Sequence, residues 1–372
     1  MTDKPAIRAE AARLQAVFKA SGATPVEADL LQPADTLLDL YGEDIRARAY
    51  TTHDPDRGEL MLRPDFTVPV VQAHMAGGAE PARYTYLGEV FRKQQTGSNR
   101  ACEYLQVGYE VFDRENPAAA DAEVFALFSE VLSPFDLTPV TGDIGILLAA
   151  VDSLATTERR KRALRRHIWR PRRFRVLLDR FTGRKPAPAT RATLLEQMAE
   201  TGVEGLIAGA GPMVGLRSAD EIATRMRHLQ QDAGARAIGA AEAEVLDVIL
   251  SLRETLTNAH EHLRDIAVDL PGISHAVARM ARRMEALDAA GIDVAGLPFE
   301  ASYGRTNMEY YDGFVFGFLA GGQPDFPPVA TGGRYDALCH VLGGGRDIPA
   351  VGGVIRPELV HQLQSHLGKG AG

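Results

Sequence analysis

The chain has 372 residues, of which 45% are hydrophobic and 24% charged, and a formal net charge of −8 at pH 7. This is ordinary globular composition for about two domains, and the acidic balance argues against nucleic acid as the main partner. The sequence has no run of 18 apolar residues and no N-terminal signal core, and Cys102 and Cys339 have neither metal-site nor disulfide-framework spacing. We therefore expect a cytoplasmic protein with no membrane partner and no metal.

The first 156 residues contain both helix and strand patterns. Ile7, Ala11, Leu14 and Phe18 recur at helical spacing, which predicts an amphipathic helix over residues 5–20. Further predicted elements are strands at 25–32 and 48–64 and helices at 67–76 and 118–133.

Residues 84–113 consist of two runs rich in aromatic and β-branched residues, joined by a polar loop, which predicts an antiparallel hairpin. Arg92 ends the first run, and the second places Gln106 and Glu110 at even spacing, hence on one face. An arginine can bind a carboxylate and a glutamate can bind an ammonium, so such a face suits a zwitterion. A surface hairpin with solvated charges would show the same spacing, and the spacing alone leaves both interpretations open.

The composition changes near residue 155, where the sequence becomes rich in Ala, Arg, Glu and Leu and has few strand patterns. We predict a helical insertion over residues 157–265, between two parts of one core, 1–156 and 266–372. Within it, Ser218 and Glu221 have the spacing of a capping box at the start of a helix. The basic segment 158–175 is open to three interpretations: an RNA or phosphate patch, a solvated helix face, or a surface facing an acidic partner.

Strand patterns return in the last part of the chain. We expect strands at 297–303, 313–319, 328–334 and 350–356, with helices at 242–256, 274–289 and 357–367. Gly209, Gly211 and Gly215 have GxGxxxG rather than GxGxxG spacing, and no P-loop is present, so we expect no bound cofactor.

The hairpin at 84–113 resembles motif 2 of class II aminoacyl-tRNA synthetases, most closely that of histidyl-tRNA synthetases. Four more segments resemble that family in order and spacing: LRPDFT (62–67), EYYDG (309–313), TGGRYD (331–336) and PAVG (349–352). The resemblance implies an α+β fold, a class II synthetase-like antiparallel sheet core flanked by helices, with a helical insertion. Pro33 lies where the family has its motif 1 proline, which implies a homodimer.

The resemblance also implies a histidine-binding site. Matches to family positions that touch histidine are Asp65, Thr67, Arg92, Gln106, Glu110, Tyr310 and Tyr311. We expect Glu110 and Gln106 to hold the amino group of histidine and Arg92 to lie near its carboxylate. The two tyrosines and Asp65, which replaces a glutamate, are expected to shape the imidazole side.

The positions that bind ATP phosphate in the family are changed. In motif 2, Gln94 replaces a glutamate of the family and Gln95 replaces an arginine. Two further arginines of the family are replaced by Cys102 and Leu359. Glu358 is retained, and Arg356 lies three positions before Leu359. Thr306 aligns with the family's catalytic arginine, with Arg305 beside it. Because adenylation needs fixed positive charge at the phosphates, we expect no catalytic residues and no adenylating activity.

The sequence ends about 13 residues after Leu359, so we expect no anticodon-binding domain. In its matching histidine-site residues, its changed ATP-site residues and its lack of room for an anticodon-binding domain, the sequence resembles the regulatory subunits of ATP phosphoribosyltransferase. That implies a non-catalytic chain that activates a short catalytic subunit in the first step of histidine biosynthesis and mediates feedback inhibition by histidine. The alternatives are an active histidine-tRNA ligase core, an amino-acid adenylating paralogue, or an RNA-binding module that uses residues 158–175.

Overall fold

A computed structural model of the chain describes residues 3–34, 47–94, 97, 101–305, 309–323 and 325–369, with the side chains described to residue 365. The chain folds as two compact units: a core unit, Met1–Ala149 with Ile249–Gly372, and a helical unit, Ala150–Val248. Among the described residues, no helix is long and apolar enough to cross a membrane.

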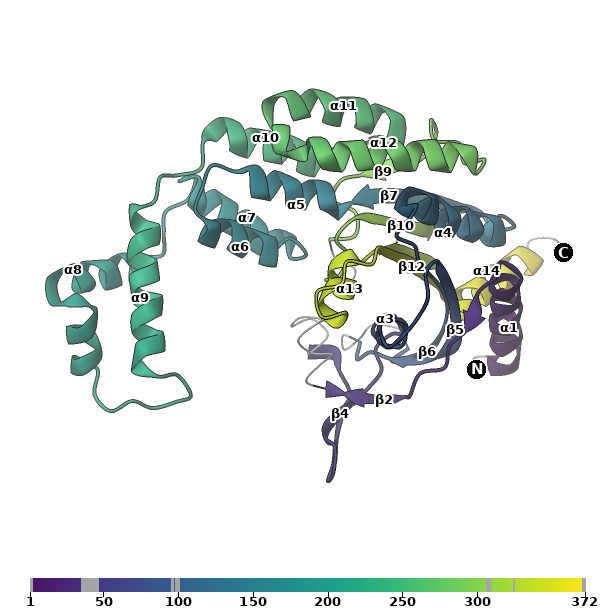
Figure 1. Ribbon diagram of the computed structural model, residues 1–372, viewed down its shortest axis with the longest axis horizontal. Coiled ribbons are helices and arrows are strands. Elements are labelled where there is room, and N and C mark those ends of the chain that lie inside the picture. The colour runs from purple at the N-terminus through teal and green to yellow at the C-terminus, as the bar shows by residue number, and fades with distance from the viewer. Residues whose placement is uncertain are drawn as a thin grey trace. The chain divides into compact units, whose positions relative to one another are not determined.

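The core unit is built on a nine-stranded sheet (Figure 1). Its strands pair in the order β1 (Thr24–Pro25), β5 (Ala82–Phe91), β6 (Glu103–Phe112), β12 (Ala350–Ile355), β11 (Ala330–Arg334), β10 (Phe314–Ala320), β7 (Leu137–Asp143), β9 (Pro298–Glu300) and β8 (Arg253–Thr255). All neighbours are antiparallel except β1–β5 and β7–β9. The predicted antiparallel sheet core is therefore confirmed, and β5–β6 is the predicted hairpin.

Helices cover the large sheet. The helix α4 (Pro117–Leu132) contacts β6, β11 and β12, and it also contacts α12 (Ser274–Ala289). Phe125 and Phe128 of α4 are buried and meet Phe316 of β10 edge to face, with ring centroids 5.5 and 5.6 Å apart. Their apolar surface, removed from water, stabilises this layer.

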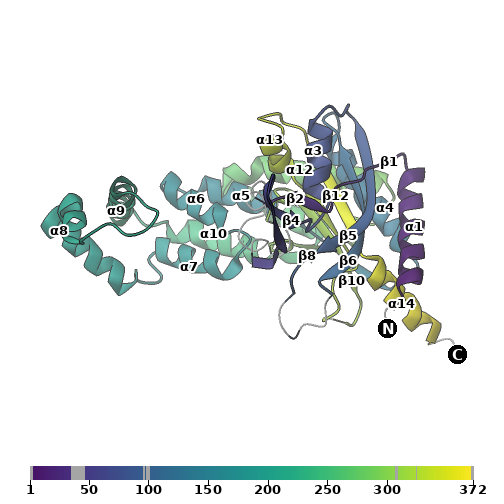
Figure 2. The same ribbon diagram turned by 90° about the horizontal axis from the view of Figure 1, so that it is seen from below.

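Other helices of the core unit pack in pairs. Figure 2 shows α1 (Lys4–Ala20) beside α14 (Pro357–Lys369). The helix α3 (Thr67–Met75) contacts α13 (Asp336–Leu342), and α11 (Leu256–Asp269) contacts α12 and the short 3₁₀ helix η1 (Pro271–Ile273). The predicted helices at 5–20, 67–76, 118–133, 274–289 and 357–367 are confirmed in position.

A separate three-stranded sheet occupies part of the segment predicted as two strands. Its order is β2 (Leu31–Pro33), β4 (Gly58–Leu62) and β3 (Thr51–Asp54). The single strand predicted at 48–64 is wrong, because the Asp54 carboxylate accepts the backbone N–H groups of Asp56 and Arg57, each at 2.9 Å. An aspartate that bonds its own backbone two and three residues ahead makes a turn, and this turn divides the segment into β3 and β4.

The helical unit consists of α-helices joined by short loops. They are α6 (Glu158–Arg166), α7 (Pro171–Phe181), α8 (Ala189–Gly209) and α9 (Ala219–Gly234), while α5 (Ile144–Ser153) and α10 (Ala240–Ser251) contain the two points where the chain passes between units. The predicted capping box is confirmed: Ser218 Oγ accepts the Glu221 N–H at 3.2 Å, and a Glu221 carboxylate oxygen accepts the Ser218 N–H at 2.8 Å.

The basic segment 158–175 forms α6 and the start of α7. Arg160 is buried and donates to Asp232 at 2.7 Å, and Arg165 donates to Asp152 at 2.6 Å. Arg162, Arg172 and Arg173 are exposed. Some arginines of the segment therefore form ion pairs within the helical unit, and others are exposed to solvent.

The predicted insertion, 157–265, extends past the helical unit. In β8, Glu254 pairs with Phe299 of β9, and the Leu256 N–H donates to the Leu297 carbonyl at 2.7 Å. A strand of three residues is too short to show an alternating pattern in the sequence. We therefore propose that the insertion ends before β8.

Buried ion pairs connect α4 to the strands and to α12. Asp121 of α4 accepts from Arg334, at the end of β11, at 2.6 and 3.0 Å and from Arg283 of α12 at 3.5 Å. Arg283 also donates to Asp143, at the end of β7, at 2.6 Å. All four side chains are buried, so each charge depends on its partners for the stabilisation that water would otherwise give.

Replacing Asp121 by asparagine is expected to lower the free energy of unfolding by about 3–5 kcal/mol, because Arg283 and Arg334 would lose a buried counter-ion. The measurement is urea unfolding followed by circular dichroism. Glu130→Gln, on an exposed residue of the same helix, is the matched control and should change stability by less than about 0.5 kcal/mol. Equal effects of the two substitutions would show that the buried ion pairs do not stabilise the fold.

Candidate functional site

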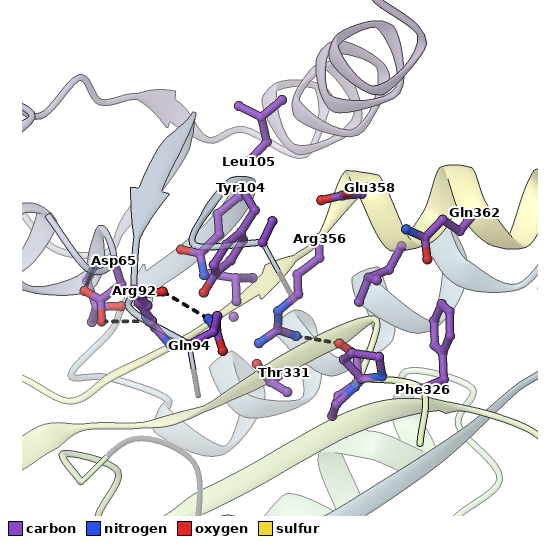
Figure 3. A pocket seen from close by; sticks show the side chains of 18 of the residues that line it. Asp65, Arg92, Gln94, Tyr104, Leu105, Phe326, Thr331, Arg356, Glu358 and Gln362 are labelled. Carbon is purple, nitrogen blue, oxygen red and sulfur yellow. Dashed lines mark hydrogen bonds and ion pairs between the residues drawn. The ribbon is translucent and has the colours of Figure 1, made fainter. Parts of the chain in front are cut away.

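The core unit contains a cavity of about 760 Å³ (Figure 3). Tyr104, Gln106 and Glu110 of β6 line it at even spacing, as expected for one face of a strand. Gly353, Val354 and Arg356 line it from β12 and the residue that follows. A volume of this size is typical of a small-molecule site.

Glu110 is the most deeply placed ionisable residue of the cavity wall, with 1% of its surface exposed. One carboxylate oxygen accepts the hydroxyls of Tyr86 at 2.9 Å and Thr67 at 3.3 Å, and the other accepts the hydroxyl of Tyr335 at 2.6 Å. Tyr310 donates to the Thr67 hydroxyl at 3.2 Å. Three hydroxyls from three distant segments thus meet one carboxyl group.

Two glycines make room for this arrangement. Gly108 lies between Gln106 and Glu110 on the cavity face, and a β-carbon there would be 2.0 Å from the ring of Tyr86, on the neighbouring strand. Gly352 pairs with Glu110 across β6 and β12, and a β-carbon there would be 1.5 Å from the carboxylate. A side chain at Gly108 would displace Tyr86, and a side chain at Gly352 would displace the Glu110 carboxylate itself.

Burial is the largest cause that raises the pKa of Glu110, to about 7. The hydrogen bonds from Tyr335 and Tyr86 act against it, and the nearby charge of Asp65 acts with it. Burial also raises the pKa values of both tyrosines well above their usual range, so their hydroxyls remain donors. Near neutral pH the cavity therefore contains a carboxyl group that a bound cation would ionise.

Asp65 and Arg92, which both line the cavity, form an ion pair. Asp65 accepts the Thr67 backbone N–H at 3.1 Å and lies 3.5 Å from a guanidinium nitrogen of Arg92. Arg92 also donates to the Pro64 carbonyl at 2.7 Å.

The side-chain carbonyl of Gln106 is buried and has no hydrogen-bond partner in the part of the chain that the structure describes. Gln106 is 1% exposed and lines the cavity. An unpaired buried acceptor costs free energy that a donor on a ligand would recover. The acceptor and the Glu110 carboxyl group together favour a ligand with N–H donors.

All seven residues predicted for histidine binding line this one cavity, while their role in binding stays a prediction. Sequence reasoning missed Tyr86 and Tyr335 as partners of Glu110. Tyr335 lies in the quoted TGGRYD segment, and Tyr86 lies opposite Gly108 in the hairpin register. A glycine between two polar residues of one strand face is the signal that could have indicated a large side chain from the next strand.

The changed family positions are only partly visible. Gln94 and Leu359 line the cavity, whereas Cys102 is not part of its wall. Arg305 is buried but does not line the cavity. Gln95 and Thr306 lie outside the described residues. Within the described ranges, no group of three His, Cys, Asp or Glu side chains is placed to hold a metal ion.

The chain is similar to known proteins over almost its whole length. Residues 3–240 and 221–360 match the family described as Histidyl-tRNA synthetase. An ATP phosphoribosyltransferase regulatory subunit from Brucella anthropi is 34% identical over 357 residues, which cover 91% of this chain and 93% of that protein.

Two solved structures share the fold. One, from Bacillus halodurans, is titled an ATP phosphoribosyltransferase regulatory subunit/histidyl-tRNA synthetase and has a TM-score of 0.66 at 21% identity, covering 96% of this chain and 79% of that one. The other, a histidine–tRNA ligase subunit from Alicyclobacillus acidocaldarius, has a TM-score of 0.60 at 23% identity, covering 98% and 94%. The class II synthetase-like fold is therefore confirmed.

The raised pKa of Glu110 predicts a pH-dependent cost of ionisation. Below the unfolded pKa the group is protonated in both states, and as pH rises toward 7 only the unfolded chain gains from losing the proton. Glu110→Gln should therefore gain about 2 kcal/mol of stability relative to the unaltered chain between pH 5 and pH 8. Urea unfolding at both pH values measures this; Glu103→Gln, exposed on the same strand, should show no such change. A pH-independent difference for Glu110→Gln would contradict the buried, titrating carboxyl group.

Proposed function

Because the chain belongs to the family of ATP phosphoribosyltransferase regulatory subunits, relatives of histidyl-tRNA synthetase, we propose that it activates a short catalytic subunit and senses histidine in the cavity around Glu110. It is a regulatory chain of histidine biosynthesis, not itself the catalytic subunit. The catalytic partner would join ATP to phosphoribosyl pyrophosphate, and bound histidine would inhibit the complex.

The unpaired carbonyl of Gln106 is the observation that supports histidine as the ligand most directly. The ammonium of histidine would donate to it and to Glu110, whose carboxyl group would then ionise. Tyr310 and Tyr311, both buried in the cavity wall, and Asp65 would shape the side that receives the imidazole. Arg92, held by Asp65 and Pro64, would lie near the carboxylate end.

Inhibition requires that histidine prefers one of two states of the complex. The coupling is reciprocal: histidine shifts the equilibrium between the two states by the same free energy by which its binding affinity differs between them. Buried contacts at Glu110 suit this role, because a small movement of Tyr86 or Tyr335 would break short hydrogen bonds.

We also propose that the chain forms a homodimer within a larger complex. Leu30, Leu31 and Tyr50 are 47, 36 and 38% exposed, and they lie in or beside the sheet that contains Pro33. Exposed apolar residues gathered in one place are typical of a protein interface. Light scattering of the isolated chain would report a monomer if this proposal is wrong.

Gln106→Leu should raise the histidine concentration needed for half-inhibition at least about tenfold, because it removes an acceptor for a charged donor. Glu110→Ala should weaken histidine binding by about 2–5 kcal/mol, because the buried ammonium of the ligand would be unpaired. Activation should persist in both variants, because the active site belongs to the partner. The measurement is a histidine inhibition curve on the reconstituted complex.

Gln362→Leu is the matched control, since Gln362 lines the same cavity at its other end (Figure 3). It should leave half-inhibition within about twofold of the unaltered complex. If Gln106→Leu and Glu110→Ala complexes assemble and are inhibited normally, histidine acts at another site and the sensing proposal is wrong.

The alternative function is amino-acid adenylation, by a histidine-tRNA ligase core or a paralogue. Gln94 and Leu359 line the cavity where the resembling family has phosphate-binding charges, so we predict no histidine-dependent exchange of labelled pyrophosphate into ATP. An exchange rate near that of a genuine synthetase, run in parallel, would favour the alternative.

A further inference from the structure

Besides Arg92, the described lining of the cavity includes two arginines, Arg48 and Arg356, and of these Arg356 lies at the end of a central strand of the large sheet. Arg356 follows β12 directly, and Val354, which also lines the cavity, precedes it by two residues, the spacing of one strand face. Figure 3 shows its side chain extending into the cavity toward Gln94 and Thr331.

The backbone of Arg356 is fixed on both sides. Its N–H donates to the Val329 carbonyl at 3.0 Å, and its own carbonyl accepts the N–H groups of Leu359 and Val360 at 3.0 and 3.2 Å. The guanidinium donates to the Pro328 carbonyl at 2.5 Å. These bonds place the group before any ligand arrives, which lowers the entropy lost on binding.

Arg356 forms no ion pair with an acidic side chain in the described part of the chain. Among the acidic residues of the lining, Asp65 is bound to Arg92 and Glu110 is bound by three hydroxyls. Burial lowers the pKa of Arg356, and the positive charge of Arg92 acts in the same direction. A guanidinium remains charged even so, and a half-buried charge without an acidic partner favours an anionic ligand.

The strand register indicates which anion fits. Ile355 pairs with Val107, so continuing the register by one residue places Arg356 opposite Gln106. Side chains directly opposite on one sheet face are close neighbours. The ammonium and carboxylate of an amino acid are attached to one carbon, so they need an acceptor and a cation that are neighbours in this way.

We propose that Arg356 binds the carboxylate of the amino-acid ligand whose ammonium Gln106 accepts, and that it makes the site selective for amino acids over their amine and alcohol analogues. This inference rests on the proposed sensing function and assigns to Arg356 a contact that resemblance would give to Arg92 alone. The guanidinium fork can form two parallel hydrogen bonds to a carboxylate, a geometry that lysine cannot reproduce.

The test is calorimetric titration of the chain with histidine and with histidinol, which has a hydroxymethyl group in place of the carboxylate. The unaltered chain should bind histidine at least about tenfold more tightly than histidinol. Arg356→Gln should weaken histidine binding by about tenfold or more and leave histidinol within about twofold, and Arg356→Lys should fall between. Arg253→Gln, an exposed arginine of the core unit, is the control and should change neither affinity.

Each other outcome has a distinct meaning. Equal losses for both ligands, or no loss for histidine, would overturn the assignment of Arg356 and leave histidine sensing intact. Binding of inorganic phosphate or AMP that depends on Arg356 and does not compete with histidine would show that the guanidinium serves a separate anion, which also overturns it. No binding of histidine by the unaltered chain would refute the sensing function together with this inference.

Discussion

A carboxyl group buried in the middle of a sheet has to be hydrogen-bonded, and the cavity of this chain is arranged around one such group, Glu110. Its oxygens are reached by hydroxyls from β5, from the start of α3 and from the residue after β11. Each hydroxyl belongs to a different segment, so three separate segments of the core unit are held to a single carboxyl group in the cavity wall. The glycines that flank Glu110, on its own strand and on β12, are needed because a side chain at either position would occupy the space of these contacts.

The same contacts connect the cavity to the opposite layer of the core unit. Arg334 and Tyr335 are successive residues, yet Arg334 bonds to Asp121 of α4 and Tyr335 bonds to Glu110 in the cavity. A short segment thus joins a buried ion-pair network to a ligand-sized cavity. Supporting contacts of this kind hold binding groups to a fixed geometry, which is what discrimination between similar ligands requires. It also means that Tyr335 cannot move far without straining the ion pairs behind it.

The long, regular parts of this fold could be predicted from sequence, and the short or register-dependent parts could not. The hairpin β5–β6 and helices α1 and α4 have ten or more residues each, enough for their periodicity to be clear. The three-residue strand β8 and the Asp54 turn are local features that such patterns do not resolve. Gln106 and Glu110 could be placed together because they share one strand face. Tyr86 and Tyr335 reach Glu110, and Arg356 reaches the cavity, from other segments of the chain. Their positions depend on the pairing register and on which residues opposite them are glycine.

Charge balance supports the proposal that a cavity resembling that of an ATP-using family binds an amino acid alone. Its described lining includes three arginines and four acidic residues: Arg48, Arg92, Arg356, Asp65, Glu110, Asp325 and Glu358. Polyphosphate brings several negative charges, and its binding needs a clear local excess of positive charge. A zwitterion brings no net charge and requires only that one cation and one anion or acceptor lie side by side. Gln106 and Arg356 on neighbouring strands meet that requirement, and the loss of arginine at Leu359 removes the excess that phosphate would need.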